Sequence, residues 1–214
     1  MAHLLVLYGT SEGQTQKIAA FIADRLRKNG HTVEVDAVEA IQSPLDAERI
    51  DGVIVGASVH AGRHKDTVVQ FVRDNRAVLD ALPSAFFSVS LAVLDASDPE
   101  EARTYVARFL QETGWTPNVV ETIAGALRYT QYGFVKRFIM KQISKRSGRP
   151  TDTSRDFEFT DWTQVSAFVD RVQALLGVSQ AEDVGCKIEN ADLKEASSGP
   201  NAPNRSALSS TRKT

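Results

Sequence analysis

The chain has 214 residues, of which 42% are hydrophobic and 24% charged, and its formal net charge is −2. This balance is typical of a soluble globular protein and excludes overall basicity as a route to nucleic acid. The single cysteine, Cys186, excludes an intramolecular disulfide framework and an iron–sulfur cluster held by cysteines, and it fits a reducing cytosol. No stretch approaches the ~20 apolar residues of a membrane span, so we expect any work at a membrane to be done from its surface.

Apolar residues follow two different spacings along the first 176 positions. Apolar or alternating runs predict five strands, at residues 3–8, 31–35, 51–57, 84–90 and 119–126. Helical spacing predicts four helices, at residues 15–29, 65–79, 99–112 and 160–176. Residues 44–50 are expected to form a short connection, helical or not. Mostly apolar strands that alternate with helices predict an α/β fold, a doubly wound five-stranded parallel sheet in the order 2-1-3-4-5.

Residues 1–176 therefore form one predicted domain. Residues 127–156 interrupt its fifth strand–helix unit as an insertion. Residues 177–214 are rich in Ser, Ala, Asn, Lys, Gly and Pro and show no apolar period, so we expect a disordered tail there.

Three polar loops, at residues 10–15, 58–62 and 88–95, follow strands whose carboxyl ends meet beside the switch between strands 1 and 3, where such folds bind ligands. The first loop lacks both the lysine of a P-loop and the glycine spacing of the dinucleotide fingerprint. It fits a third type of site, in which hydroxyls, backbone N–H groups and a helix N-terminus hold a phosphate monoester without a cation. The alternative is a plain strand–turn–helix junction capped by a hydroxyl.

This loop resembles the one with which flavodoxins hold the phosphate of FMN. On that resemblance Thr10, Ser11 and Thr15 supply hydroxyls, and Gly13 permits close approach of the backbone. Glu12 must turn its carboxylate away from the phosphate or cap an N–H group. The resemblance implies these FMN-binding residues: Thr10, Ser11, Glu12, Gly13, Gln14, Thr15, Ser58, Val59, His60, Ser88, Ser90 and Leu91.

Two histidines lie in or beside the second loop. For His60, contact with the flavin edge and exposure to solvent are equally good interpretations, whereas for His64 we favour a solvent-facing side chain. No group of His, Cys and carboxylate residues has metal-ligand spacing, so we expect no metal site. The sequence names no catalytic residue, and the visible chemistry is what a bound flavin would carry.

The predicted insertion contains a basic amphipathic stretch. No acidic residue lies between Glu121 and Asp152, whereas Arg128, Lys136, Arg137 and several further basic residues do. On a helical wheel the apolar residues from Phe134 to Ile143 fall on one half, and the basic residues fall on or beside the other. Such a helix can lie on an anionic membrane surface. By itself the pattern favours an ordinary helix packed on its own domain with a solvated basic face, and nucleic-acid binding is a weaker interpretation.

Longer segments extend the resemblance over residues 3–176. They are GASVHAGRH, PSAFFSV, IAGALRYTQY, KRFIMKQISKRSG and TDW. Together they resemble the flavodoxin-type, menaquinone-dependent protoporphyrinogen IX dehydrogenases of bacterial haem synthesis, which implies a flavodoxin-like fold with a basic insertion in the fifth βα unit.

The same resemblance implies an activity and its partners. FMN would take electrons from protoporphyrinogen IX and pass them to menaquinone or ubiquinone. The chain would be cytoplasmic, peripheral on the inner face of the cell membrane, and would not bind nucleic acid. The resemblance assigns substrate or membrane contact to Arg128, Tyr129, Lys136, Arg137, Phe138 and Lys141. An electron-carrying flavodoxin, a flavin oxidoreductase with another substrate and a regulatory domain without FMN remain as alternatives.

Overall fold

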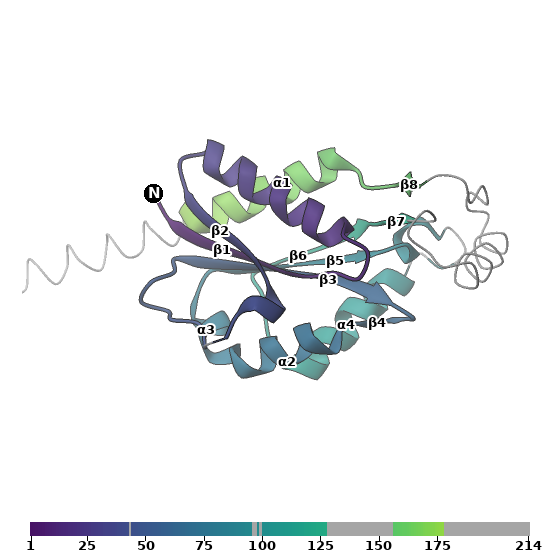
Figure 1. Cartoon of the computed structure of the whole chain (residues 1–214), viewed down its shortest axis with the longest axis horizontal. Coiled ribbons are helices and arrows are strands. Elements are labelled where there is room, and N and C mark those ends of the chain that lie inside the picture. The colour runs from purple at the N-terminus through teal and green to yellow at the C-terminus, as the bar shows by residue number, and fades with distance from the viewer. Residues whose placement is uncertain (43, 96–97, 99, 128–155, 178–214) are drawn as a thin grey trace, which may run out of the picture. The chain divides into compact units, whose positions relative to one another are not determined.

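A parallel sheet of five strands forms the centre of the unit made by residues 1–177 (Figure 1). The structure is a computed structural model that describes residues 1–42, 44–95, 98, 100–127 and 156–177. In spatial order the strands are β2 (Thr32–Ala37), β1 (His3–Gly9), β3 (Gly52–His60), β5 (Ser84–Ser90) and β6 (Val119–Ala124). All four neighbouring pairs are parallel, which confirms the predicted doubly wound order.

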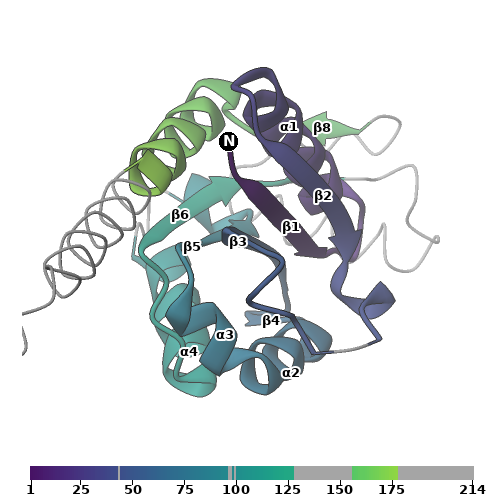
Figure 2. The ribbon, with the colours of Figure 1, turned by 90° about the vertical axis from the view of Figure 1, so that its left-hand side faces the viewer.

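Helices cover both faces of the sheet (Figures 1 and 2). On one face lie α1 (Gln14–Lys28) and a helix over residues 162–177. On the other lie α2 (Asp66–Asp74), α3 (Arg76–Ala81) and α4 (Glu101–Thr113). Each interface is a separate apolar core, and Ile22 and Phe168 are fully buried in one, as are Val72 and Phe86 in the other. This burial on both faces explains why the strand sequences are so apolar.

The predicted helix at residues 65–79 is in fact two helices, because Asn75 interrupts it. The side-chain Nδ2 of Asn75 donates to the carbonyl of Phe71 at 2.9 Å, and its Oδ1 accepts from the backbone N of Leu45 at 2.8 Å. Local bonding of this kind lets an asparagine compete with the helical ladder. The connection at residues 44–50 contains a turn and no helix.

Two short antiparallel pairings at the carboxyl edge of the sheet were not predicted. The strand β4 (Arg63–His64) folds back on β3 as a hairpin, and β7 (Ala126–Leu127) pairs with β8 (Phe157–Glu158). The predicted strand at 119–126 therefore ends as β6 at Ala124. The β7–β8 pair joins the two flanks of the predicted insertion, whose residues 128–155 lie outside the described part of the chain, as does the tail from residue 178.

Candidate functional site

The loop at residues 10–15 joins β1 to the first turn of α1, and a glycine makes the turn possible. Gly13 has φ +85°, in the left-handed region that favours glycine, and its backbone N donates to the side-chain Oγ1 of Thr10 at 2.9 Å. Ser11 is exposed, whereas Glu12 is half-buried. The N-terminus of a helix of this length carries unpaired N–H groups and a positive partial charge, both of which attract an anion.

A buried hydroxyl lies in the first turn of this helix. Thr15 is fully buried, and among the described residues its Oγ1 has no hydrogen-bond partner. Ser58, near the carboxyl end of β3, is half-buried, but its Oγ is also buried and has no partner among those residues. A buried polar group without a partner costs stability, of the order of 1–3 kcal/mol, and such groups in native proteins commonly have a functional reason. Both hydroxyls fit a ligand that carries hydrogen-bond acceptors.

A cation reaches this loop from a distant part of the sequence. The Nζ of Lys65 lies 3.3 Å from the carbonyl oxygen of Thr10, although the two residues are 55 positions apart. The same Nζ forms an ion pair with Glu39 at 2.7 Å, so its charge is largely compensated. The loop sequence contains no Lys or Arg, but a cation from outside the loop still lies beside it. The packing of α2 against β1 brings Lys65 there, and the loop sequence alone could not show this.

The side chain of Gln14 is buried in the domain, which its position in a polar loop did not indicate. Its side chain is 5% exposed, and its Nε2 donates to the Oγ1 of Thr160 at 2.8 Å. The structure thus directs this side chain into the domain, and a ligand contact of Gln14 would come from its backbone.

The β3–β4 hairpin carries the second set of predicted residues. Val59 is half-buried and pairs with His64, whereas His60 is exposed and pairs with Arg63. The turn between them places Ala61 at φ +50° and Gly62 at φ +78°. Positive φ at both central residues is the geometry of the tight turns that match the twist of a hairpin.

The solvent-facing interpretation of His64 was wrong. His64 is 6% exposed, and its ring packs against Phe86 and Phe109, which stack on each other, with centroid distances of 5.6 and 4.8 Å. Its Nε2 is 2.9 Å from the Oγ of Ser88. Burial lowers the pKa of His64 to about 4, so the imidazole is neutral at neutral pH. In the sequence it stands among polar residues, which hid its role as the residue that fastens the hairpin to the sheet.

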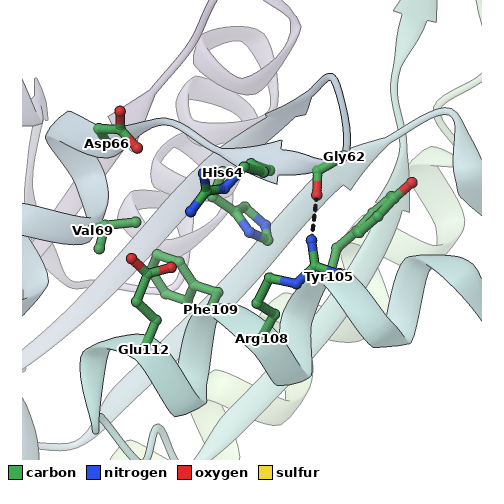
Figure 3. Close-up of a pocket in the computed structure, with 9 residues that line it drawn as sticks. Gly62, His64, Asp66, Val69, Tyr105, Arg108, Phe109 and Glu112 are labelled. Carbon is green, nitrogen blue, oxygen red and sulfur yellow. Dashed lines mark hydrogen bonds between the residues drawn. The ribbon is translucent and has the colours of Figure 1, made fainter.

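His64 also lines a small pocket between the hairpin and α4 (Figure 3). Arg108 borders this pocket and donates from Nη1 to the carbonyl of Gly62 at 3.2 Å, which gives the hairpin a second attachment. Tyr105 stands beside it, and its hydroxyl is hydrogen-bonded to Glu101.

The third predicted loop begins at the carboxyl end of β5. Ser88 and Ser90 are buried, and the hydroxyl of Ser88 is bonded to His64. Leu91 is half-buried and packs against the buried Leu127 of β7. The three loops do converge at the carboxyl edge of the sheet, as predicted. Six predicted substrate or membrane residues lie outside the described residues: Arg128, Tyr129, Lys136, Arg137, Phe138 and Lys141.

Two other features are absent from the described residues. They contain no group of three or more His, Cys, Asp or Glu side chains placed to hold a metal ion. None of the described helices is long and apolar enough to pass through a lipid bilayer.

Comparison with known proteins identifies the family. Among solved structures, oxidised flavodoxin 1 from Bacillus cereus is 18% identical, with a TM-score of 0.48 over 82% of this chain and 98% of its own. The family model of the flavodoxin domain matches residues 5–154. Protoporphyrinogen IX dehydrogenase (quinone) of Escherichia coli (strain K12) is 37% identical over 80% of this chain and 94% of its own. The protein of that name from Leishmania major is 34% identical over 80% of this chain and 74% of its own. The chain belongs to the flavodoxin domain family and is a homologue of protoporphyrinogen IX dehydrogenase (quinone).

Proposed function

We propose that this chain binds FMN and uses it to oxidise protoporphyrinogen IX to protoporphyrin IX, with a membrane quinone as the electron acceptor. The observation that carries the proposal is the buried hydroxyl of Thr15 at the start of α1, which has no partner among the described residues. The chain is also homologous to protoporphyrinogen IX dehydrogenase (quinone) over 94% of the Escherichia coli protein. A plain capped junction would leave no reason to bury that hydroxyl without a partner.

The phosphate of FMN would be held by the loop at residues 10–15. The hydroxyls of Thr10 and Thr15 can each donate a hydrogen bond to a phosphate oxygen, and the helix N-terminus adds N–H groups and a favourable dipole. Exposed Ser11 offers a third hydroxyl. Ser58 and Val59, together with His60 and the end of β5 at Ser90, would border the ring system at the same edge of the sheet.

The proposed reaction removes six electrons and six protons from the porphyrinogen in three two-electron steps. Bound FMN supplies the chemistry that a protein side chain lacks, because it accepts an electron pair from one partner and passes it to another. Three quinones are therefore reduced for each porphyrin formed. The role of the protein is to hold the flavin and to bring the two hydrophobic reactants, the porphyrinogen and the quinone, to it.

The quinone requirement supports a peripheral location on the inner face of the cell membrane. The sequence of the predicted insertion, basic on one side and apolar on the other, suits an anionic lipid surface. Sedimentation with anionic vesicles tests this proposal. Reversal of charge at Lys136 and Arg137 to Glu should reduce the bound fraction. Unchanged binding would exclude these residues from membrane contact.

An anaerobic assay tests the activity itself. The purified protein is mixed with FMN, protoporphyrinogen IX and a menaquinone analogue, and porphyrin fluorescence is followed. We expect fluorescence to grow only when both FMN and the quinone are present. Bound flavin without porphyrin formation would instead indicate an electron carrier or an oxidoreductase with another substrate.

A further inference from the structure

A buried chain of hydrogen bonds connects the phosphate loop to the far end of the domain sequence. The Nε2 of Gln14 donates to the Oγ1 of Thr160 at 2.8 Å, and that hydroxyl donates to the carbonyl of Ala124 at 2.8 Å. Gln14 and Thr160 are 146 positions apart, and both are buried, with exposures of 5% and 9%. The relay thus ties the first turn of α1 to the last residue of β6.

The direction of each bond in this relay is fixed by the groups that form it. An amide NH₂ can only donate and a carbonyl can only accept, so the Thr160 hydroxyl must accept from Gln14 and donate to Ala124. Loss of that hydroxyl would leave a buried donor and a buried acceptor unpaired, which is far more costly than loss of a solvent-exposed bond. The relay therefore specifies one orientation of the Gln14 side chain.

The orientation of Gln14 matters because of its two neighbours in the chain. Gly13 takes the positive φ of the loop, and Thr15 carries the buried hydroxyl that has no partner in the described part of the chain. A side chain fixed between them also fixes the peptide groups on either side. The acceptor of the second bond, Ala124, is held in a fixed position because it pairs with Ser90 in the parallel sheet.

We propose that Gln14 and Thr160 are positioning residues for the phosphate of the flavin. They hold the first turn of α1 so that the N–H groups and the Thr15 hydroxyl are aimed before the ligand arrives, and preorganisation of this kind raises affinity. The inference rests on the proposed FMN binding and adds Thr160, a residue outside the loop, to the determinants of phosphate recognition.

The test uses the substitution Thr160→Val, which removes the hydroxyl and keeps the side-chain shape. Affinities for FMN and for riboflavin, which lacks the phosphate, are measured by quenching of flavin fluorescence. We expect FMN affinity to fall ~10-fold or more, because misaimed donors are lost from a charge-assisted site, while riboflavin affinity changes less than about 2-fold. Thr160→Ser, which keeps the hydroxyl, should restore FMN affinity.

Gln164 offers a matched control four positions after Thr160, in the helix over residues 162–177. Its Nε2 donates to the Oε1 of Glu121 and to the carbonyl of Thr122, both at 3.0 Å, so it also ties this helix to β6. Gln164→Met should lower the unfolding temperature without changing either flavin affinity, because its bonds do not reach the phosphate loop.

Each outcome of these titrations decides a separate question. Equal losses of FMN and riboflavin affinity in Thr160→Val, or no loss, would overturn the positioning role. If Thr160→Val does not fold, Gln14→Met breaks the relay at its other end and must show the same phosphate-specific loss. If the unaltered protein binds FMN no better than riboflavin, the phosphate site of the proposed function fails, whatever the variants do.

Discussion

The phosphate loop and the β3–β4 hairpin lie at the same edge of the sheet but are held in place by different means. Buried polar bonds fix the loop, and its left-handed position is occupied by Gly13. The hairpin has Ala61 in the left-handed region, and it is fastened by the imidazole of His64 among aromatic rings. The loop therefore keeps a buried hydroxyl, that of Thr15, without a partner among the described residues, whereas the attachment of the hairpin depends on a titratable group.

The largest expected effect is a loss of unfolding free energy at acidic pH, and it concerns the hairpin and not the loop. Burial lowers the pKa of His64 to about 4 in the folded state, from the ordinary histidine value of about 6.5 that applies when the chain is unfolded. Between these values the unfolded chain binds more protons, so stability falls as pH drops from about 6.5 to about 4. The full loss from this group is about 3 kcal/mol, since one pKa unit corresponds to about 1.4 kcal/mol. Urea unfolding at several pH values measures it.

His64→Gln is the matched variant for this titration. Its amide can still form a hydrogen bond with Ser88, but it cannot take up a proton in this range. The variant should show a flatter dependence of unfolding free energy on pH below 6.5. An identical slope in both proteins would show that other groups cause the acid sensitivity.

The next effect concerns ligand binding rather than folding. Thr15→Val removes the buried hydroxyl and keeps the side-chain shape. We expect FMN affinity to fall 10- to 100-fold, because a hydrogen bond to a charged group contributes about 1.5–3 kcal/mol. The flavin-free protein should keep its stability or gain about 1 kcal/mol, since an unpaired buried group is lost. Flavin titration and thermal unfolding measure the two effects.

Thr113 provides the control for that substitution. It is also buried, but its Oγ1 donates to the carbonyl of Phe109 at 2.9 Å. Thr113→Val should lower stability by about 1 kcal/mol and leave FMN affinity unchanged. A loss of stability in Thr15→Val as large as that in Thr113→Val would mean that the Thr15 hydroxyl has a partner in the free protein.

The smallest expected effect lies at the tip of the hairpin. Ala61→Asn creates the Asn-Gly pair that such turns favour and should stabilise the protein by about 0.5–1 kcal/mol, because asparagine tolerates positive φ better than alanine. Ala61→Val should destabilise it, because a branched side chain is strained there. Thermal unfolding of the two variants compares them, and a shift in the same direction for both would contradict the turn geometry.

The sheet order and the strand–loop–helix junction at residues 10–15 could be predicted because local patterns encode them. Apolar runs set the strands, and Thr10, Gly13 and Thr15 stand in a recognisable spacing at a strand–helix junction. His64 could not be placed, because a two-residue strand gives no periodicity. The contacts of Lys65 with Thr10 and of Thr160 with Gln14 span 55 and 146 positions, and only the folded chain brings them together.

The most direct test of the proposed function follows the bound flavin itself. The FMN-loaded protein is mixed anaerobically with protoporphyrinogen IX in the absence of quinone, and its visible absorbance is recorded before a menaquinone analogue is added. The proposed function predicts that the porphyrinogen bleaches the flavin absorbance and that one porphyrin is formed for every three flavins reduced. The absorbance should return when the quinone is added. Absorbance that stays at its oxidised level in the presence of protoporphyrinogen IX would contradict it.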